Sequence, residues 1–127
     1  MTELFINKYI EARPYKTKDN SIVRELMHPA HGQAQNQSLA EAIVQPGAST
    51  LRHKHKLAEE IYHITSGCGE MSLDDKSFPV FKGDTIIIRP GTVHHLSNSG
   101  TEALTVLCCC SPAYDHDDTI LILDTTE

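Results

Sequence analysis

Short runs of hydrophobic and β-branched residues, each followed by turn-forming residues, recur along most of the chain. Pro46-Gly47, Lys82-Gly83-Asp84 and Pro90-Gly91 are among the turns, because Gly supplies positive φ and Pro fixes φ. Many short strands separated by regular turns predict an all-β sandwich or barrel. Only the segment 11–19 leaves room for a helical turn. The predicted strands are Ser21–His28, Leu39–Val44, Thr50–His55, Glu60–Ile64, Met71–Leu73, Phe78–Phe81, Thr85–Ile88, His94–Ser97, Leu104–Cys110 and Thr119–Leu123.

Composition limits the class of protein. The 127 residues, 39% hydrophobic and 22% charged, are typical of one globular domain, which we expect to span residues 1–127. A net charge of -6 argues against nucleic-acid binding, which favours a basic face. The longest apolar run, Leu104–Cys110, is much shorter than the ~20 residues of a membrane helix. No signal peptide is visible at the N-terminus, so we expect a cytoplasmic protein without membrane or nucleic-acid partners.

The four cysteines do not have the spacing of a disulfide framework or of a zinc-thiolate site. Three are consecutive, Cys108, Cys109 and Cys110, and the fourth is Cys68. On a strand, Cys108 and Cys110 would share one face and Cys109 the other. We interpret them as small apolar residues in a reducing compartment, with metal contact or redox chemistry as the alternative.

Eight histidines in so short a chain direct attention to metal binding. His53 and His55 share one face of a strand, since side chains alternate. A turn through residues 56–59 would let Glu60 join them from the neighbouring strand, with Tyr62 on the same inward face. The bases at positions 52, 54 and 56 would then face solvent. We expect the inward face to include Leu51, Tyr62, Ile64 and Leu96.

A second histidine group follows a Pro-Gly turn. His94 and His95 open a predicted strand, so only one of them can face the interior. Three imidazoles and a carboxylate that converge in a barrel form a divalent-metal site.

These residues carry a resemblance to the cupins. The first cupin motif, Gly-x5-His-x-His with a Glu and a Gly downstream, matches Gly47, His53, His55, Glu60 and Gly67. The second motif, Gly-x5-Pro-x-Gly-x2-His-x3-Asn, matches Gly83, Gly91, His94 and Asn98, with Arg89 in place of its first proline. The motifs span residues 47–67 and 83–98. The resemblance implies a double-stranded β-helix, or jelly-roll barrel.

The resemblance also implies one divalent metal ion per chain, held by His53, His55, Glu60 and His94. His94 is preferred to His95, and Glu60 to Glu59, because each holds the motif position. The ligand set suits Fe, Mn, Zn or Ni. The remaining histidines are expected on the outer face, at a subunit contact or in the tail: His28, His31, His63, His95 and His116.

Several activities occur among proteins that resemble this chain. We favour a metal-dependent, oxygenase-like enzyme acting on a small organic molecule, with Tyr62 as catalytic proton donor. The alternative interpretation of Tyr62 is an aromatic residue of the barrel core without a catalytic role. The other hypotheses for the protein are a non-catalytic binding module for a small molecule or metal, and a sugar isomerase or lyase. The isomerase or lyase hypothesis is less favoured, because the sequence shows no inward-facing base beyond the metal ligands. A phosphorylated sugar substrate would also need a cluster of basic residues that face inward.

The C-terminal run Ile120–Leu123 resembles a buried strand. We expect it to pair with the N-terminal strand or to cross to a second subunit. Small cupins resemble one another in forming homodimers that cover sheet edges, and we predict a homodimer here.

Overall fold

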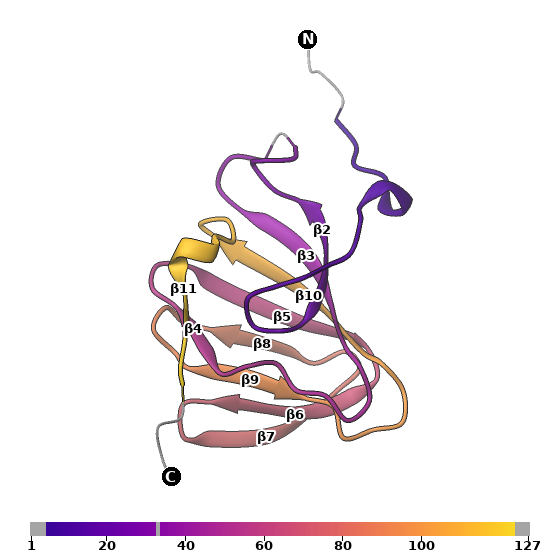
Figure 1. Ribbon diagram of the computed structural model, residues 1–127, viewed down its shortest axis with the longest axis vertical. Coiled ribbons are helices and arrows are strands. Elements are labelled where there is room, and N and C mark those ends of the chain that lie inside the picture. Colours follow the sequence, from indigo (N-terminus) through magenta and orange to yellow (C-terminus); the bar gives the residue numbers. More distant parts are fainter. Residues whose placement is uncertain (1–4, 33, 124–127) are drawn as a thin grey trace.

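The protein folds as two antiparallel β-sheets that face each other (Figure 1). The computed structural model describes residues 5–32 and 34–123. One sheet has the strand order β1-β2-β3-β10-β5-β8 and the other β11-β4-β9-β6-β7. The strands are β1 (Tyr15–Lys16), β2 (Ile22–Met27), β3 (Ser38–Val44), β4 (His53–His55), β5 (Glu59–Ser66), β6 (Cys68–Leu73), β7 (Lys76–Phe81), β8 (Thr85–Ile88), β9 (His94–Ser97), β10 (Leu104–Ser111) and β11 (Thr119–Leu121).

The all-β jelly-roll prediction is confirmed, and all ten predicted strands are present, with Thr85–Ile88 and His94–Ser97 as predicted and the other eight shifted at one or both ends. Within the described residues, the helices are two 3-10 turns, η1 (Tyr9–Glu11) and η2 (His116–Asp118). Neither is long or apolar enough to span a membrane. The segment 11–19, the one place where the pattern allows a helical turn, contributes the end of η1 and the short strand β1.

The core lies between the inner faces of the two sheets. Strand β5 alternates strictly through Glu60, Tyr62 and Ile64, which are all buried, while Ile61 faces out. This period of two is what places one face of a strand against the opposite sheet. The core side chains are Val44, Tyr62, Ile64, Met71, Val80, Ile86, Ile88, Leu96, Leu104 and Val106.

The non-ligand residues of the two motifs shape the backbone around the core. The four motif glycines all adopt positive φ, which favours glycine. At Gly67 a Cβ would also lie 2.5 Å from the carbonyl oxygen of Ala103. Asn98 is buried, and its Nδ2 donates to the carbonyl oxygens of Val44 and Glu102 at 2.9 and 2.7 Å. Asn98 therefore joins the end of β3 to the loop between β9 and β10 and has a structural role.

One expectation about the face of a strand and one about strand pairing are wrong. Leu51 is 44% exposed rather than inward, because β4 begins only at His53 and the buried side chain before it is Thr50. The C-terminal strand β11 does not pair with the N-terminal strand. It pairs with β4, with Thr119 opposite His55, and Leu123 is exposed.

Candidate metal centre

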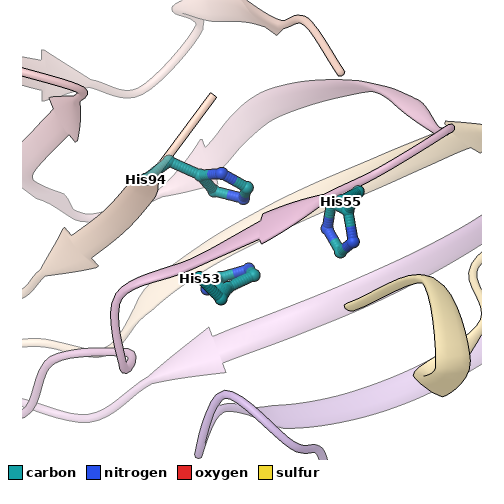
Figure 2. A group of neighbouring side chains, drawn as sticks. All are labelled: His53, His55 and His94. Atoms are coloured by element: carbon teal, nitrogen blue, oxygen red, sulfur yellow. The ribbon is translucent and has the colours of Figure 1, made fainter. Parts of the chain in front are cut away.

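Two neighbouring strands bring three histidines together. His53 and His55 are two residues apart on β4, and His94 is the first residue of β9, directly opposite His53 in the ladder. One ring nitrogen from each lies within 4.8 Å of the others, and all three side chains are buried. Figure 2 shows the three imidazoles turned toward one another. The prediction that His94, and not His95, faces inward agrees with this arrangement, because His95 lies outside the cluster.

The outer nitrogen of each imidazole is held by the protein. Nδ1 of His53 lies 2.7 Å from the carbonyl oxygen of Leu51, and Nδ1 of His94 lies 3.0 Å from that of Thr92. Nδ1 of His55 lies 3.1 Å from the Thr119 hydroxyl, which already donates its own hydrogen to the Asp115 carbonyl. Since all three partners can only accept, each Nδ1 carries a proton, and in the neutral imidazole Nε2 then presents a lone pair. Such partners orient histidines for metal binding.

Glu60 enters the cluster from β5. Its Oε1 lies 3.2 Å from Nε2 of His55 and 3.5 Å from Nε2 of His94, and its Oε2 accepts a hydrogen bond from the Cys110 thiol at 3.3 Å. The predicted turn between β4 and β5 makes this approach feasible. The Asp118 carboxylate holds that turn by accepting from two consecutive backbone amides of residues 57 and 58, at 2.8 and 3.1 Å.

The electrostatics of the cluster favour a cation. Burial and the neighbouring His94 lower the pKa of His53 to about 4. Burial alone would lower the pKa of His55, but the hydrogen bond and charge of Glu60 raise it. Burial alone would raise the pKa of Glu60, but His55 and His94 outweigh it and hold the pKa at about 2. The carboxylate is therefore ionised in a buried site, which requires a positive partner.

The residues fit a divalent metal ion. Nε2 of His94 is fully buried and has no hydrogen-bond partner, which is costly unless the atom binds something else. Imidazole nitrogens suit Zn, Fe, Cu and Ni, and a carboxylate oxygen extends the range to Mn. His53, His55 and His94 thus form a potential metal site, with the Glu60 carboxylate beside it.

A pocket opens onto the cluster from between the sheets. Its free volume is about 50 Å³. Tyr62 lies at its wall, with its ring edge-on to His94 at 6.0 Å between centroids. Burial, and then the Glu60 charge, raise the pKa of Tyr62 well above its ordinary value, so the phenol stays protonated. The lining includes Asp19, Ser38, Ala40, His53, His55, Glu60, Leu96, Cys108, Cys110 and Tyr114.

The cysteines and the other five histidines lie outside the histidine cluster. All four cysteines are free thiols, and Cys108 and Cys110 both line the pocket. Burial raises the pKa of both thiols, so they are not thiolates. His63 bonds Thr85 on the outer face at 2.8 Å. Of the remaining histidines, His28 contacts the Tyr114 carbonyl at 2.7 Å and His116 the Tyr114 hydroxyl at 3.0 Å.

Sequence reasoning missed two groups at the site. Asp19, in the turn between β1 and β2, places Oδ2 3.3 Å from Nε2 of His53. Thr119 on β11 orients His55. Neither belongs to a motif, and only the fold brings them near the histidines. The acidic segment 115–118 was visible in the sequence, but its role in holding the β4–β5 turn was not.

The fold and the histidine cluster define a cupin. The family model of the cupin domain, Cupin_2, matches residues 40–110, and the chain belongs to this family. An uncharacterised protein of Methanocaldococcus jannaschii is 51% identical over 91% of this chain and 92% of its own length.

Two solved structures of differently named proteins are similar to this chain in fold. The polyketide cyclase RemF of Streptomyces resistomycificus has a TM-score of 0.79 at 18% identity, covering 98% of this chain and 88% of its own. An oxalate decarboxylase of Lactobacillus farciminis has a TM-score of 0.77 at 22% identity, covering 89% of this chain and 34% of its own. At these identities the likeness concerns the fold alone.

Proposed function

We propose that the protein is an enzyme that depends on one divalent metal ion, held by His53, His55, Glu60 and His94, and that acts on a small organic molecule. The convergence of three buried histidines, two of which place Nε2 within 3.5 Å of the buried Glu60 carboxylate, carries the proposal. Each Nδ1 is tied to an acceptor, so the free nitrogens are oriented before any ion arrives.

The pocket favours an uncharged substrate. No Lys or Arg is among its described lining residues, and its two acidic side chains are Asp19 and Glu60. A phosphorylated sugar would find no lysine or arginine side chain in this lining to bind its phosphate group. Aliphatic, aromatic and thiol side chains form most of the remaining wall, which suits a compact molecule that presents a carbonyl or hydroxyl group.

Tyr62 is the proposed catalytic proton donor. Its raised pKa keeps the hydroxyl group protonated, and its position in the pocket wall lets it donate a hydrogen bond to a bound substrate. The apolar wall excludes water around that bond.

When bound, the ion would supply either a site for dioxygen or Lewis-acid polarisation of a substrate oxygen. We propose oxygenase-like turnover first, and the protonated state of Cys108 and Cys110 is compatible with it, since thiols oxidise mainly as thiolates. Lewis-acid chemistry without oxygen is the second candidate, and a polyketide cyclase has a similar fold. A non-catalytic binding module remains the alternative to both.

The first test is elemental analysis of purified wild type beside His55→Ala and Glu60→Ala, with His63→Ala on the outer face as matched control. We expect about one ion per chain in the wild type and control, and its loss in the other two variants. A wild-type protein that neither contains nor takes up metal would contradict the proposal. Oxygen uptake with candidate substrates, repeated under anaerobic conditions, then separates the two chemistries.

We also propose that the protein is a homodimer. Leu39, Cys109, Ile61 and Ile87 lie in one row across β3, β10, β5 and β8, on the outer face of the larger sheet. The three aliphatic members are between 36% and 41% exposed. An apolar row of this kind favours contact with a second subunit.

A further inference from the structure

A second carboxylate reaches the histidine cluster from the N-terminal part of the chain. Asp19 lies in the turn between β1 and β2, and its Oδ2 is 3.3 Å from Nε2 of His53. Its side chain is only 13% exposed and lines the pocket. Asp19 precedes both motifs and the family match, which begins at residue 40. The family resemblance therefore assigns it no role.

The turn fixes which oxygen of Asp19 faces the cluster. Oδ1 accepts hydrogen bonds from the Ser21 amide at 3.1 Å, from the Ser21 hydroxyl at 2.7 Å and from the Thr17 hydroxyl. These donors occupy Oδ1 and leave Oδ2 directed at His53. Because Nδ1 of His53 donates to Leu51, Nε2 presents a lone pair to that oxygen. Two Lewis bases facing each other at this distance favour a cation between them.

The turn itself is anchored to the strands that hold the ligands. The Leu51 amide donates to the backbone carbonyl of Asp19 at 2.7 Å, and Leu51 in turn orients His53. Lys18 donates to the carbonyl oxygen of Thr119 at 2.7 Å, and Thr119 orients His55. Asp19 therefore lies in a turn that is tied to the same backbone that places the histidines.

We propose that Asp19 Oδ2 is a fifth protein donor to the ion, beside His53, His55, Glu60 and His94. This inference rests on the proposed function. Two carboxylates would neutralise a divalent ion within the protein, which again fits an uncharged substrate. A second oxygen donor also shifts the preference of the site toward Mn or Fe and away from ions that favour nitrogen and sulfur.

The test compares wild type with Asp19→Asn for Mn²⁺ affinity, by chelator competition, and for the visible absorption of the Co²⁺-loaded protein. The amide keeps an acceptor for the Ser21 and Thr17 donors but removes the charge. We expect Mn²⁺ affinity to fall roughly 10- to 100-fold. We also expect stronger absorption per cobalt, since cobalt with fewer ligands absorbs more strongly. Asp84→Asn is the matched control, because Asp84 is a turn aspartate that accepts from the Phe81 amide away from the cluster.

Ser21→Ala separates ligation from turn stability, because it removes a donor to Oδ1 and leaves the carboxylate. A loss of affinity in Ser21→Ala as large as in Asp19→Asn would overturn the inference. So would wild-type affinity and an unchanged cobalt spectrum in Asp19→Asn. If Asp19→Asn does not fold, a crystal structure of Mn²⁺-loaded wild type decides, and Asp19 Oδ2 outside bonding distance of the ion overturns it.

His55→Ala and Glu60→Ala are measured alongside. Loss of metal in both, with full retention in Asp19→Asn, would mean that only the role of Asp19 is wrong. Retention of metal in all three variants would mean that the proposed metal centre itself is wrong.

Discussion

The chemistry of the site depends on how individual polar atoms are paired. Each imidazole uses Nδ1 for a protein acceptor and keeps Nε2 for the centre of the cluster. Glu60 divides its two oxygens similarly: Oε1 faces the histidines, and Oε2 accepts from the Cys110 thiol. A pre-oriented donor set loses less conformational entropy on binding than one that must first be ordered.

The His55–Glu60 pair predicts how the stability of the metal-free protein depends on pH. Glu60 has a folded pKa of about 2 against an ordinary 4.5, so its stabilisation is present above pH 4.5 and is lost as pH falls toward 2. His55 has a pKa raised above 6.5, so its stabilisation is present below pH 6.5 and is lost as pH rises through the folded pKa. We expect the pair to contribute most between pH 4.5 and 6.5, by up to about 3 kcal/mol.

Urea unfolding of metal-free wild type and Glu60→Gln across pH 3 to 9 measures this effect. The difference in unfolding free energy should peak in the window and shrink on both sides. A difference that does not vary with pH would contradict the assignment of the pair.

At the scale of elements, the edge strand β11 and the adjoining turn η2 complete the site. β11 pairs with β4 and supplies Thr119 to His55, while the adjoining η2 supplies Asp118 to the β4–β5 turn. The second motif turn is also tied to β4, since the Gly91 amide donates to the His55 carbonyl at 2.8 Å. The three-residue strand β4 is thus held on both edges, by β11 and β9.

We predict that Thr119→Val weakens metal binding roughly 10-fold or more, because the proton on Nδ1 of His55 loses its acceptor. The unpaired groups should also lower the stability of the metal-free protein by about 1–3 kcal/mol. Thr119→Ser keeps the hydroxyl and should restore most of the affinity. Chelator competition and thermal melts check both effects, and equal metal affinity in Thr119→Val and wild type would refute the role of β11.

In the whole molecule, each sheet has one face toward the core and one face toward solvent. Inward side chains of the larger sheet form the core and the pocket, while its outward side chains include the apolar row through Ile61. The single domain over residues 1–127 and the cytoplasmic location stay predictions. Residues 1–4, 33 and 124–127 lie outside the described part of the chain.

We predict that the wild type at micromolar concentration has about twice the 14.1 kDa chain mass in light scattering. Ile61→Lys should reduce the mass to that of one chain, because a charge in the centre of an apolar interface is left without a partner. Leu57→Lys is the control, since Leu57 is exposed in the β4–β5 turn and away from the row. A monomeric wild type would show that the row is not a subunit contact.

The strands, the jelly-roll barrel and the three histidines of the cluster could be predicted from the sequence. Its period of two places His53, His55 and Tyr62 inward, and the spacing of two motifs selects His94 over His95. Such signals are local, since a strand alternates wherever it lies and a turn needs glycine at a fixed position.

The groups that surround those histidines follow from the three-dimensional packing of distant segments. Asp19 and Thr119 lie 34 and 64 positions from the histidines that they contact, and nothing in their local sequence marks them. The outward position of Leu51 and the pairing of β11 with β4 were likewise decided by where β4 begins and which sheet edge was free. These are long-range contacts, and a single sequence does not record which distant segments pack together.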